Sequence, residues 1–384
     1  MVHTFDIGMM FWEREDAIDI MHTFNFSRPA IRKFDIKGYA YKKMGRIRKG
    51  IKYFRMTKCI DKSGKCMGYS FIVRMEPWLF ITQRESIDLF LCSAENIDEL
   101  TALFSNFMIQ YVQGTERAYL SELSLWNCRR IDYTHNFHFD DKRDAETFYK
   151  LSKRTSLHRR TREKRISGRS IFNQSTAEAN LSSKAMFYDK RAQIEADYAG
   201  MDEDDLDELT SSAENLIRYE IQCYKGKIST IMRKYNLSGR SILFFLNEDI
   251  ANELLFAQYK ASIGFGDFYE LSRAKSRIMH YEGTLSKGQR ITPGMRKNLF
   301  QFMQLVADTR GLDKARKCFP EGRTIKNSNI FVQGSDNTFL NRLKDLEAME
   351  INPVPIPRGG SKKNEAGEVL DDYPKYLRNP IHSW

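Results

Sequence analysis

The sequence predicts an α+β fold, in which a central antiparallel sheet is flanked by helices and followed by a helical C-terminal region. The first part of the chain contains short apolar–polar alternations separated by turn residues, which is typical of antiparallel strands with one polar face. From about residue 229 onward, apolar residues recur at helical spacing instead. We therefore expect one domain over residues 1–228, a helical domain over 229–350, and an extended or disordered tail over 351–384.

Within the first domain, residues 1–80 indicate short strands. Residues 46–56 alternate in part, with basic residues outward, and residues 69–75 indicate a buried strand. The turn residues at 61–65 predict that these two strands form a hairpin. Apolar residues within 96–113 recur every three or four positions, which predicts a helix with one buried face. A second helix is expected over 140–154.

The C-terminal half predicts helices over 248–259, 269–281, 293–309 and 338–347. Such helices suit DNA binding or a partner protein, and a helical domain that merely packs is an equally good interpretation. The tail begins with a proline-rich run and continues with polar residues, a composition that favours an extended or disordered segment.

The net charge indicates a polyanionic partner. The 384 residues carry a formal charge of +11 and have a pI of about 9.2, which favours nucleic acid first and an anionic membrane second. The alternative is a basic surface that binds nothing. The most basic stretch lies at 153–165, and the residues expected to contact DNA phosphates there are Arg154, Arg159, Arg160, Arg162 and Lys164.

The remaining composition predicts a cytoplasmic protein that does not enter a membrane. No apolar run reaches the roughly 18 residues that a membrane span needs, and the N-terminus lacks the pattern of a secretory signal. The six cysteines form no CxxC pair, so a zinc module is not expected. We expect the cysteines to be free cytosolic thiols.

Residues 130–139 predict a strand with an unusual polar face. Because side chains alternate across a strand, Arg130, Asp132, Asn136 and His138 would share one face. Asp132 and His138 would lie about 20 Å apart along an extended strand, so they cannot bind one ion without a bulge. We therefore favour Asp132 as a metal ligand, with His138 or Asn136 as weaker candidates. The alternative is a surface acid and an ordinary histidine.

Residues 216–222 repeat this pattern, with Arg218 and Glu220 on one face of an apolar strand. If the two strands are neighbours in one sheet, the carboxylates of Asp132 and Glu220 can share a divalent ion. Oxygen ligands of this kind suit Mg²⁺ or Mn²⁺. The alternative is a set of arginine–carboxylate pairs without a metal.

Tyr188 is the candidate nucleophile. It lies where a strand-like run gives way to a helix-like run, two residues before Lys190. A free phenol has a pKa of about 10 and attacks poorly at neutral pH, but a nearby cation stabilises the phenolate. Tyrosine attack on a DNA phosphodiester would give a covalent 5′-phosphotyrosine and a free 3′-hydroxyl.

The order of these motifs resembles the gene II/gene X family of phage and plasmid rolling-circle replication initiators. The stretches that carry the resemblance are Arg130-Ile131-Asp132, Tyr188-Asp189-Lys190 and Arg218-Tyr219-Glu220, with looser similarity to about residue 358. The resemblance implies an HUH-like nicking domain in which Tyr188 is the nucleophile and Lys190 the accompanying lysine.

The expected function is therefore metal-dependent, tyrosine-mediated nicking and rejoining of single-stranded or hairpin DNA at a replication origin. Asp132 and Glu220, with His138, would hold Mg²⁺ or Mn²⁺, and Arg130 and Arg218 would contact DNA. A host helicase and DNA polymerase would then continue replication in the cytoplasm of a bacterial host. The alternatives are a conjugative mobilisation relaxase and a catalytically inactive DNA-binding regulator.

Overall fold

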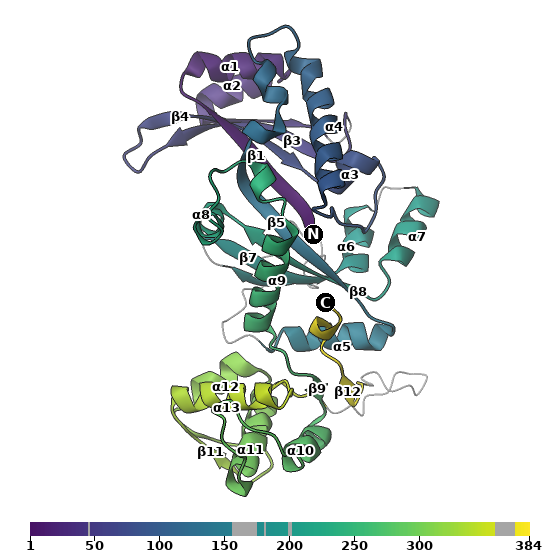
Figure 1. Cartoon of the computed structure of the whole chain (residues 1–384), viewed down its shortest axis with the longest axis vertical. Helices are drawn as coiled ribbons and strands as arrows, with labels where there is room; N and C mark the ends of the chain where they lie inside the picture. Colours follow the sequence, from purple (N-terminus) through teal and green to yellow (C-terminus); the bar gives the residue numbers. More distant parts are fainter. Residues whose placement is uncertain (45–46, 156–174, 180–181, 199–201, 358–372) are drawn as a thin grey trace. The chain divides into compact units, whose positions relative to one another are not determined.

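The computed structural model describes residues 1–44, 47–155, 175–179, 182–198, 202–357 and 373–384 (Figure 1). Its α+β architecture with a central antiparallel sheet confirms the predicted fold class. The strands follow the order β2-β3-β4-β1-β5-β8-β7-β6. Their bounds are β1 (Val2–Phe11), β2 (Tyr39–Lys43), β3 (Ile51–Ile60), β4 (Cys66–Met75), β5 (Asn127–His138), β6 (Ser175–Ala179), β7 (Ser183–Asp189) and β8 (Leu216–Cys223).

The chain divides into two compact units, each built from three segments. Unit 1 contains Met1–His135, Ala179–Ala185 and Glu220–Leu255, and unit 2 contains Asn136–Glu178, Met186–Tyr219 and Phe256–Trp384. The expected domain boundaries after residues 228 and 350 stay predictions.

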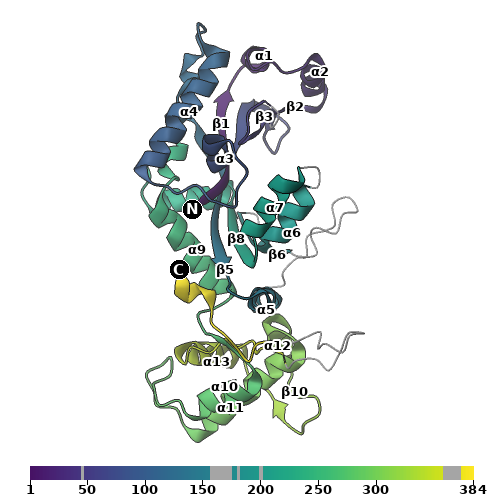
Figure 2. The same ribbon diagram turned by 90° about the vertical axis from the view of Figure 1, so that its right-hand side faces the viewer.

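One face of the unit 1 sheet carries an aromatic core. Phe54 on β3 and Phe71 on β4 point to the same side, where their ring centroids are 5.6 Å apart. Helix α4 (Ala94–Val112) contributes Phe107, which packs against Phe54, and Phe104, whose ring meets Trp126 edge-on. Figure 2 views this layer from the side, with α4 beside the strands. Helix α4 matches the helix predicted over residues 96–113. Because the aromatic rings occupy this face of the sheet, polar side chains occupy the opposite face of the sheet.

The prediction of strands throughout residues 1–80 is wrong for α1 (Arg14–Thr23) and α2 (Arg28–Lys37), and for the last few residues, where α3 (Pro77–Thr82) begins. Helix α2 has strong local signals at both ends. The Ser27 hydroxyl accepts a hydrogen bond from the Ala30 backbone N–H, and a proline lies in the first turn. At the other end, Gly38 adopts φ +71°, a left-handed conformation that favours glycine. These capping signals outweigh the short apolar alternation.

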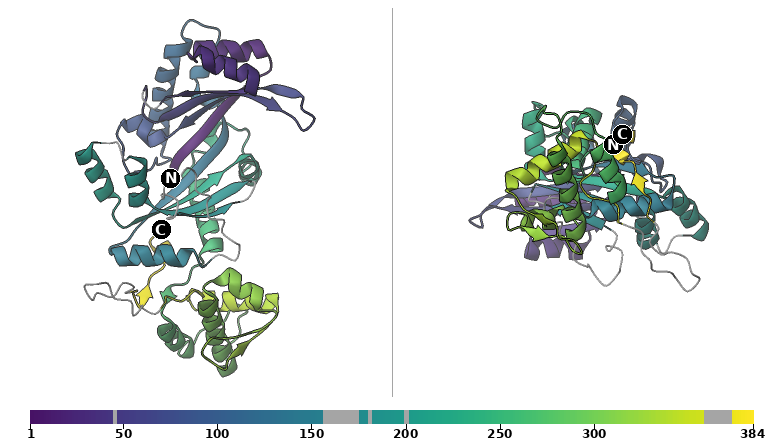
Figure 3. Two further views of the ribbon diagram at one scale, coloured as in Figure 1. Left: turned by 180° about the vertical axis from the view of Figure 1, so that it is seen from behind. Right: turned by 90° about the horizontal axis from the view of Figure 1, so that it is seen from below.

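The other helices of unit 1 are α3 (Pro77–Thr82), α8 (Lys225–Lys234) and the first part of α9 (Glu248–Ser262). Unit 2 contains α5 (Lys142–Ser152), α6 (Lys190–Asp197), α7 (Glu203–Ser212), α10 (Leu271–Met279), α11 (Pro293–Thr309), α12 (Leu312–Cys318) and α13 (Asp336–Ala348). Figure 3 shows α10 to α13 grouped together, and the rings of Phe302, Phe319 and Phe339 pack edge-on within this group. The helical C-terminal region expected from the sequence is therefore present.

The last described residues are packed into unit 2. Strand β12 (Tyr376–Leu377) pairs antiparallel with β9 (Phe268–Tyr269). The fully buried Asn379 side chain accepts a hydrogen bond from the Tyr259 hydroxyl (2.6 Å). It also donates to the backbone carbonyls of Gly264 (2.9 Å) and Gly266 (3.0 Å). The Ile381 backbone N–H also donates to the same side-chain oxygen (3.2 Å), so the hydrogen-bonding capacity of the Asn379 amide is fully used.

Candidate functional site

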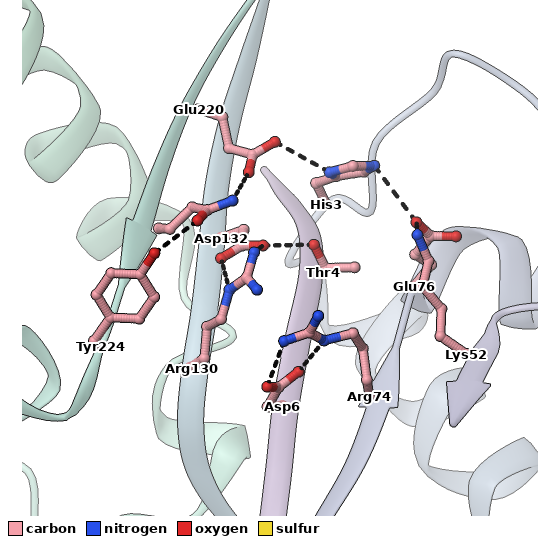
Figure 4. Close-up of polar contacts among 11 residues, drawn as sticks. His3, Thr4, Asp6, Lys52, Arg74, Glu76, Arg130, Asp132, Glu220 and Tyr224 are labelled. Carbon is pink, nitrogen blue, oxygen red and sulfur yellow. Dashed lines mark hydrogen bonds and ion pairs between the residues drawn. The ribbon is translucent and has the colours of Figure 1, made fainter. Parts of the chain in front are cut away.

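The polar face of unit 1 carries a row of charged residues. The pairing registers of β3, β4, β1 and β5 align Tyr53 with Arg74, Arg74 with Asp6, and Asp6 with Arg130. Figure 4 shows the centre of this row, to which β8 adds Glu220. Strands β5 and β8 are neighbours in the sheet, which meets the condition set by the sequence for bringing Asp132 and Glu220 together. Since both carboxylates are buried, their protonation depends on the groups around them.

Asp132 is fully buried and its carboxylate is bound by a fork. Arg130 donates from Nε to Oδ1 (2.7 Å) and from Nη2 to Oδ2 (2.5 Å), and the Thr4 hydroxyl donates to Oδ2 (2.6 Å). Burial raises the pKa of Asp132, and the negative charge of Glu220 raises it further. Arg130 and Thr4 oppose this, and the resulting pKa is about 7. Asp132 is therefore suited to exchange a proton near neutral pH.

Glu220 has the opposite character. His3 Nδ1 lies 3.2 Å from Oε2, and Gln222 donates from Nε2 to Oε1 (2.7 Å). Burial raises the pKa of Glu220, but the hydrogen bonds and charge of His3, together with Gln222 and Arg130, outweigh it and lower the pKa to about 2. Two neighbouring carboxylates whose pKa values are pushed apart are typical of acid–base sites, although structural ion-pair networks produce the same effect.

Two chains of contacts extend from Glu220. The Tyr224 hydroxyl donates to Gln222 Oε1 (2.8 Å), which links a tyrosine to Glu220 through one amide. On the other side, His3 Nε2 lies 3.8 Å from Glu76 Oε1, and Glu76 pairs with Lys52 (2.5 Å). The network therefore joins residues from β1, β3 and β8.

Further charges surround the carboxylates. Arg74 binds Asp6 through two hydrogen bonds, from Nε to Oδ1 (2.6 Å) and from Nη2 to Oδ2 (2.7 Å). Burial lowers the pKa of Lys184 on β7, whereas the negative charges of Glu220 and Asp132 act in the opposite direction. Lys184 is therefore a cation that the Asp132–Glu220 pair influences.

The donor set has the right chemistry for Mg²⁺ or Mn²⁺, but the carboxylates are already engaged. Every oxygen of Asp132 and Glu220 accepts a hydrogen bond from a protein group. Over the described ranges, no three His, Cys, Asp or Glu side chains are arranged to hold a metal ion. A cation bound by these two carboxylates would therefore have to displace some of their present partners, such as His3 or Gln222 at Glu220.

The other predicted residues fall in unit 2 or outside the described residues. Tyr188 on β7 is 8% exposed, and Lys190, the first residue of α6, donates to Gln193 (3.0 Å). Buried Arg218 donates from Nε to Asn136 Oδ1 (2.8 Å).

His138 is exposed, and partial burial and the Arg218 charge lower its pKa. Arg154 is partly exposed after α5, while Arg159, Arg160, Arg162 and Lys164 lie outside the described residues.

Several residues of the site were not predicted from the sequence. Thr4 and Asp6 alternate with Phe5 and Ile7 on β1, so a period-of-two pattern was available to identify them. His3 and Tyr224 carry no comparable signal. His3 reaches Glu220 across 217 positions of sequence, and Tyr224 follows the last residue of β8.

Comparison of this chain with family models, with curated proteins and with solved structures finds no significant match. A search of the described residues for a helix both long and apolar enough to cross a membrane also finds none.

Proposed function

We propose that this chain initiates rolling-circle replication by nicking and rejoining single-stranded or hairpin DNA at an origin, using a tyrosine nucleophile on an HUH-like scaffold. The supporting observation is the pair of buried carboxylates, Asp132 and Glu220, on neighbouring strands of an antiparallel sheet. Their different pKa values and the surrounding arginines suit chemistry on a phosphodiester. The net charge of +11 favours a polyanionic substrate.

In the proposed reaction, a tyrosine oxygen bonds to the scissile phosphorus and the bond from phosphorus to the 3′ oxygen breaks. The phenol loses a proton and the departing 3′ oxygen gains one. With a pKa of about 7, Asp132 can accept or supply a proton at neutral pH. When bound, Mg²⁺ or Mn²⁺ held by Asp132 and Glu220 would offset charge on the phosphate. Rejoining is the reverse reaction.

Two tyrosines are candidates for the nucleophile. Tyr188 is assigned by its place in the motif order, beside Lys190. Tyr224 is favoured by a contact, because its hydroxyl reaches Glu220 through Gln222. Removing either hydroxyl by substitution to phenylalanine keeps the ring and its packing, so both variants test chemistry rather than folding.

The test is incubation of the protein with Mn²⁺ and a pool of single-stranded oligonucleotides of random sequence that are labelled at the 3′ end. Since the 5′ phosphate of the downstream fragment stays on the tyrosine, the label would migrate with the protein in a denaturing gel. We expect an adduct with wild type and Tyr224→Phe, and none with Tyr188→Phe or in EDTA. Loss of the adduct in Tyr224→Phe alone would transfer the nucleophile role to Tyr224 and retain the function.

If neither wild type nor the two variants form an adduct while salt-sensitive DNA binding persists, the nicking function is refuted. That result would favour the alternative of a catalytically inactive DNA-binding regulator. A conjugative mobilisation relaxase would use the same chemistry. Transfer of the nicked strand to recipient cells would distinguish it from an initiator, whose activity is followed by copying with a host helicase and DNA polymerase.

A further inference from the structure

Tyrosines and cations are interleaved on the β2–β3 part of the same polar face. Tyr39 and Tyr41 alternate along β2, and β3 contributes Tyr53. The rings of Tyr41 and Tyr39 are 5.8 Å apart, and those of Tyr41 and Tyr53 are 5.5 Å apart. Tyr41 is 45% exposed, so a ring of this cluster is open to a ligand. We call Tyr39, Tyr41, Tyr53 and Arg55 the tyrosine surface.

Cations lie over these rings. The Arg55 guanidinium is 5.8 Å from the centre of the Tyr41 ring and 6.0 Å from that of Tyr53. Lys33 Nζ is 4.8 Å from the Tyr39 ring, and Arg74 is 5.0 Å from the Tyr53 ring. Aromatic faces combined with arginine are the features that bind unstacked bases and the backbone of single strands.

Part of this positive charge has unused hydrogen-bonding capacity. Among the described residues, the buried Nε atoms of Arg55 and Arg129 have no hydrogen-bond partner. Arg129, Lys225 and Arg55 all lie close enough to Cys59 to oppose the rise that burial causes in its thiol pKa. These cations therefore gather around one position on β3, and such a cluster of positive charge favours the phosphate groups of a nucleic acid.

The tyrosine surface is continuous with the candidate site. Tyr41 pairs directly with Arg55 across β2 and β3. From there, the row formed by Tyr53, Arg74, Asp6 and Arg130 crosses four neighbouring strands and ends beside Asp132. A strand of nucleic acid lying across these β-strands would meet aromatic rings first and the carboxylates next.

We infer that the tyrosine surface binds single-stranded DNA, with a base stacked on Tyr41 and phosphates bound by Arg55 and Arg129. Single strands fit because a base must be unstacked to lie on an aromatic face. The choice of DNA over RNA rests on the proposed function, whereas the binding itself requires no nicking. The surface would hold the substrate beside Asp132 and so set which phosphate is presented for cleavage.

The test is fluorescence anisotropy of a labelled oligothymidylate of about 30 nucleotides, measured in EDTA so that no cleavage occurs. Because a stacked base is worth roughly 1–3 kcal/mol, Tyr41→Ala should weaken binding by about 5- to 150-fold. Tyr41→Phe keeps the stacking face and should bind like wild type. Arg55→Gln should weaken binding and reduce the slope of log K against log salt by about 0.7, as expected for one lost phosphate contact on a single strand.

The matched control is Tyr119→Ala, a tyrosine of similar exposure (38%) in the short helical turn Ala118–Ser121. Wild-type affinity in Tyr119→Ala supports the inference, provided that the circular dichroism spectra of all four variants match that of wild type. Equal weakening by Tyr119→Ala and Tyr41→Ala, or tighter binding of duplex DNA than of the single strand, would overturn it. Equal or tighter binding of oligouridylate would overturn the assignment to DNA. Binding through Tyr41 without any covalent adduct would refute nicking and leave this inference standing.

Discussion

Protonation of Asp132 gives a pH dependence whose sign and size follow from its surroundings. Its pKa is about 7 in the folded protein, against an ordinary value of 3.8. The folded state therefore holds a proton that the unfolded state loses between about pH 3.8 and 7, so this contribution to stability is complete below that window and is lost as the pH rises through it. At about 1.36 kcal/mol per pH unit the whole effect is roughly 4 kcal/mol, of which about 2–3 kcal/mol falls between pH 5 and 8.

The assay is urea unfolding followed by tryptophan fluorescence from pH 5 to 8, with wild type beside Asp132→Asn. Trp126 is fully buried in the aromatic core of unit 1 and therefore reports on the unfolding of that unit. The difference cancels the titration of groups that the substitution leaves unchanged, and wild type should lose about 2–3 kcal/mol relative to the variant over this range. Thr4→Val removes a donor to the ionised carboxylate and should move the transition to higher pH.

A difference between wild type and Asp132→Asn that stays constant within about 0.5 kcal/mol across this range would refute the reasoning. It would mean that Asp132 is ionised throughout, with Arg130 outweighing burial. The same titration tests the proposed metal, because Mg²⁺ or Mn²⁺ binds the ionised carboxylate. Millimolar metal should therefore stabilise wild type at pH 8 and leave Asp132→Asn unchanged.

Three further predictions concern residues outside the carboxylate pair. Asn379→Ala should lower the free energy of unfolding of unit 2 by about 3–5 kcal/mol, because two glycine carbonyls and a tyrosine hydroxyl lose their partner. Asn379→Asp should lower the free energy of unfolding in urea by at least as much, since a carboxylate oxygen would then face both carbonyls. Gly50→Ala should destabilise unit 1 by several kcal/mol in the same assay: Gly50 has φ +83°, and a Cβ there would lie 2.3 Å from backbone atoms of Phe80. Burial raises the pKa of Cys223 to about 12, so a thiol reagent at pH 8 should label it only after unfolding, and rapid labelling of the native protein would contradict this.

The strongest sequence signals were local and periodic. The buried stripe of α4 and the caps of α2 are both encoded within single segments, and the caps of α2 outweigh the short apolar alternation that favoured strands there. The shared face of Arg130 and Asp132 followed from strand alternation alone. Their fork of two hydrogen bonds is a contact within one strand, two residues apart, rather than a pair across strands.

Contacts between distant segments were beyond the reach of sequence patterns. Nothing around His3 indicates that it meets Glu220, because that contact depends on how β1, β5 and β8 are ordered in the sheet. The different pKa values of Asp132 and Glu220 depend on the same ordering. Burial and the charge of Glu220 on the neighbouring strand raise the pKa of Asp132, whereas His3 on β1 lowers the pKa of Glu220 against the effect of burial. Periodicity predicts which face a side chain occupies, and sheet order decides what it meets there.

The position of β5 between β1 and β8 also has a consequence during synthesis on the ribosome. After β5 has paired with β1, about 80 more residues must be synthesised before β8 is available to pair with the other edge of β5. At roughly 5–20 residues per second, that edge stays open for about 4–16 seconds. An open strand edge invites pairing with another chain, and charged side chains on the strand discourage it. Arg130 and Asp132 would thus protect the nascent chain from aggregation before they take part in any site.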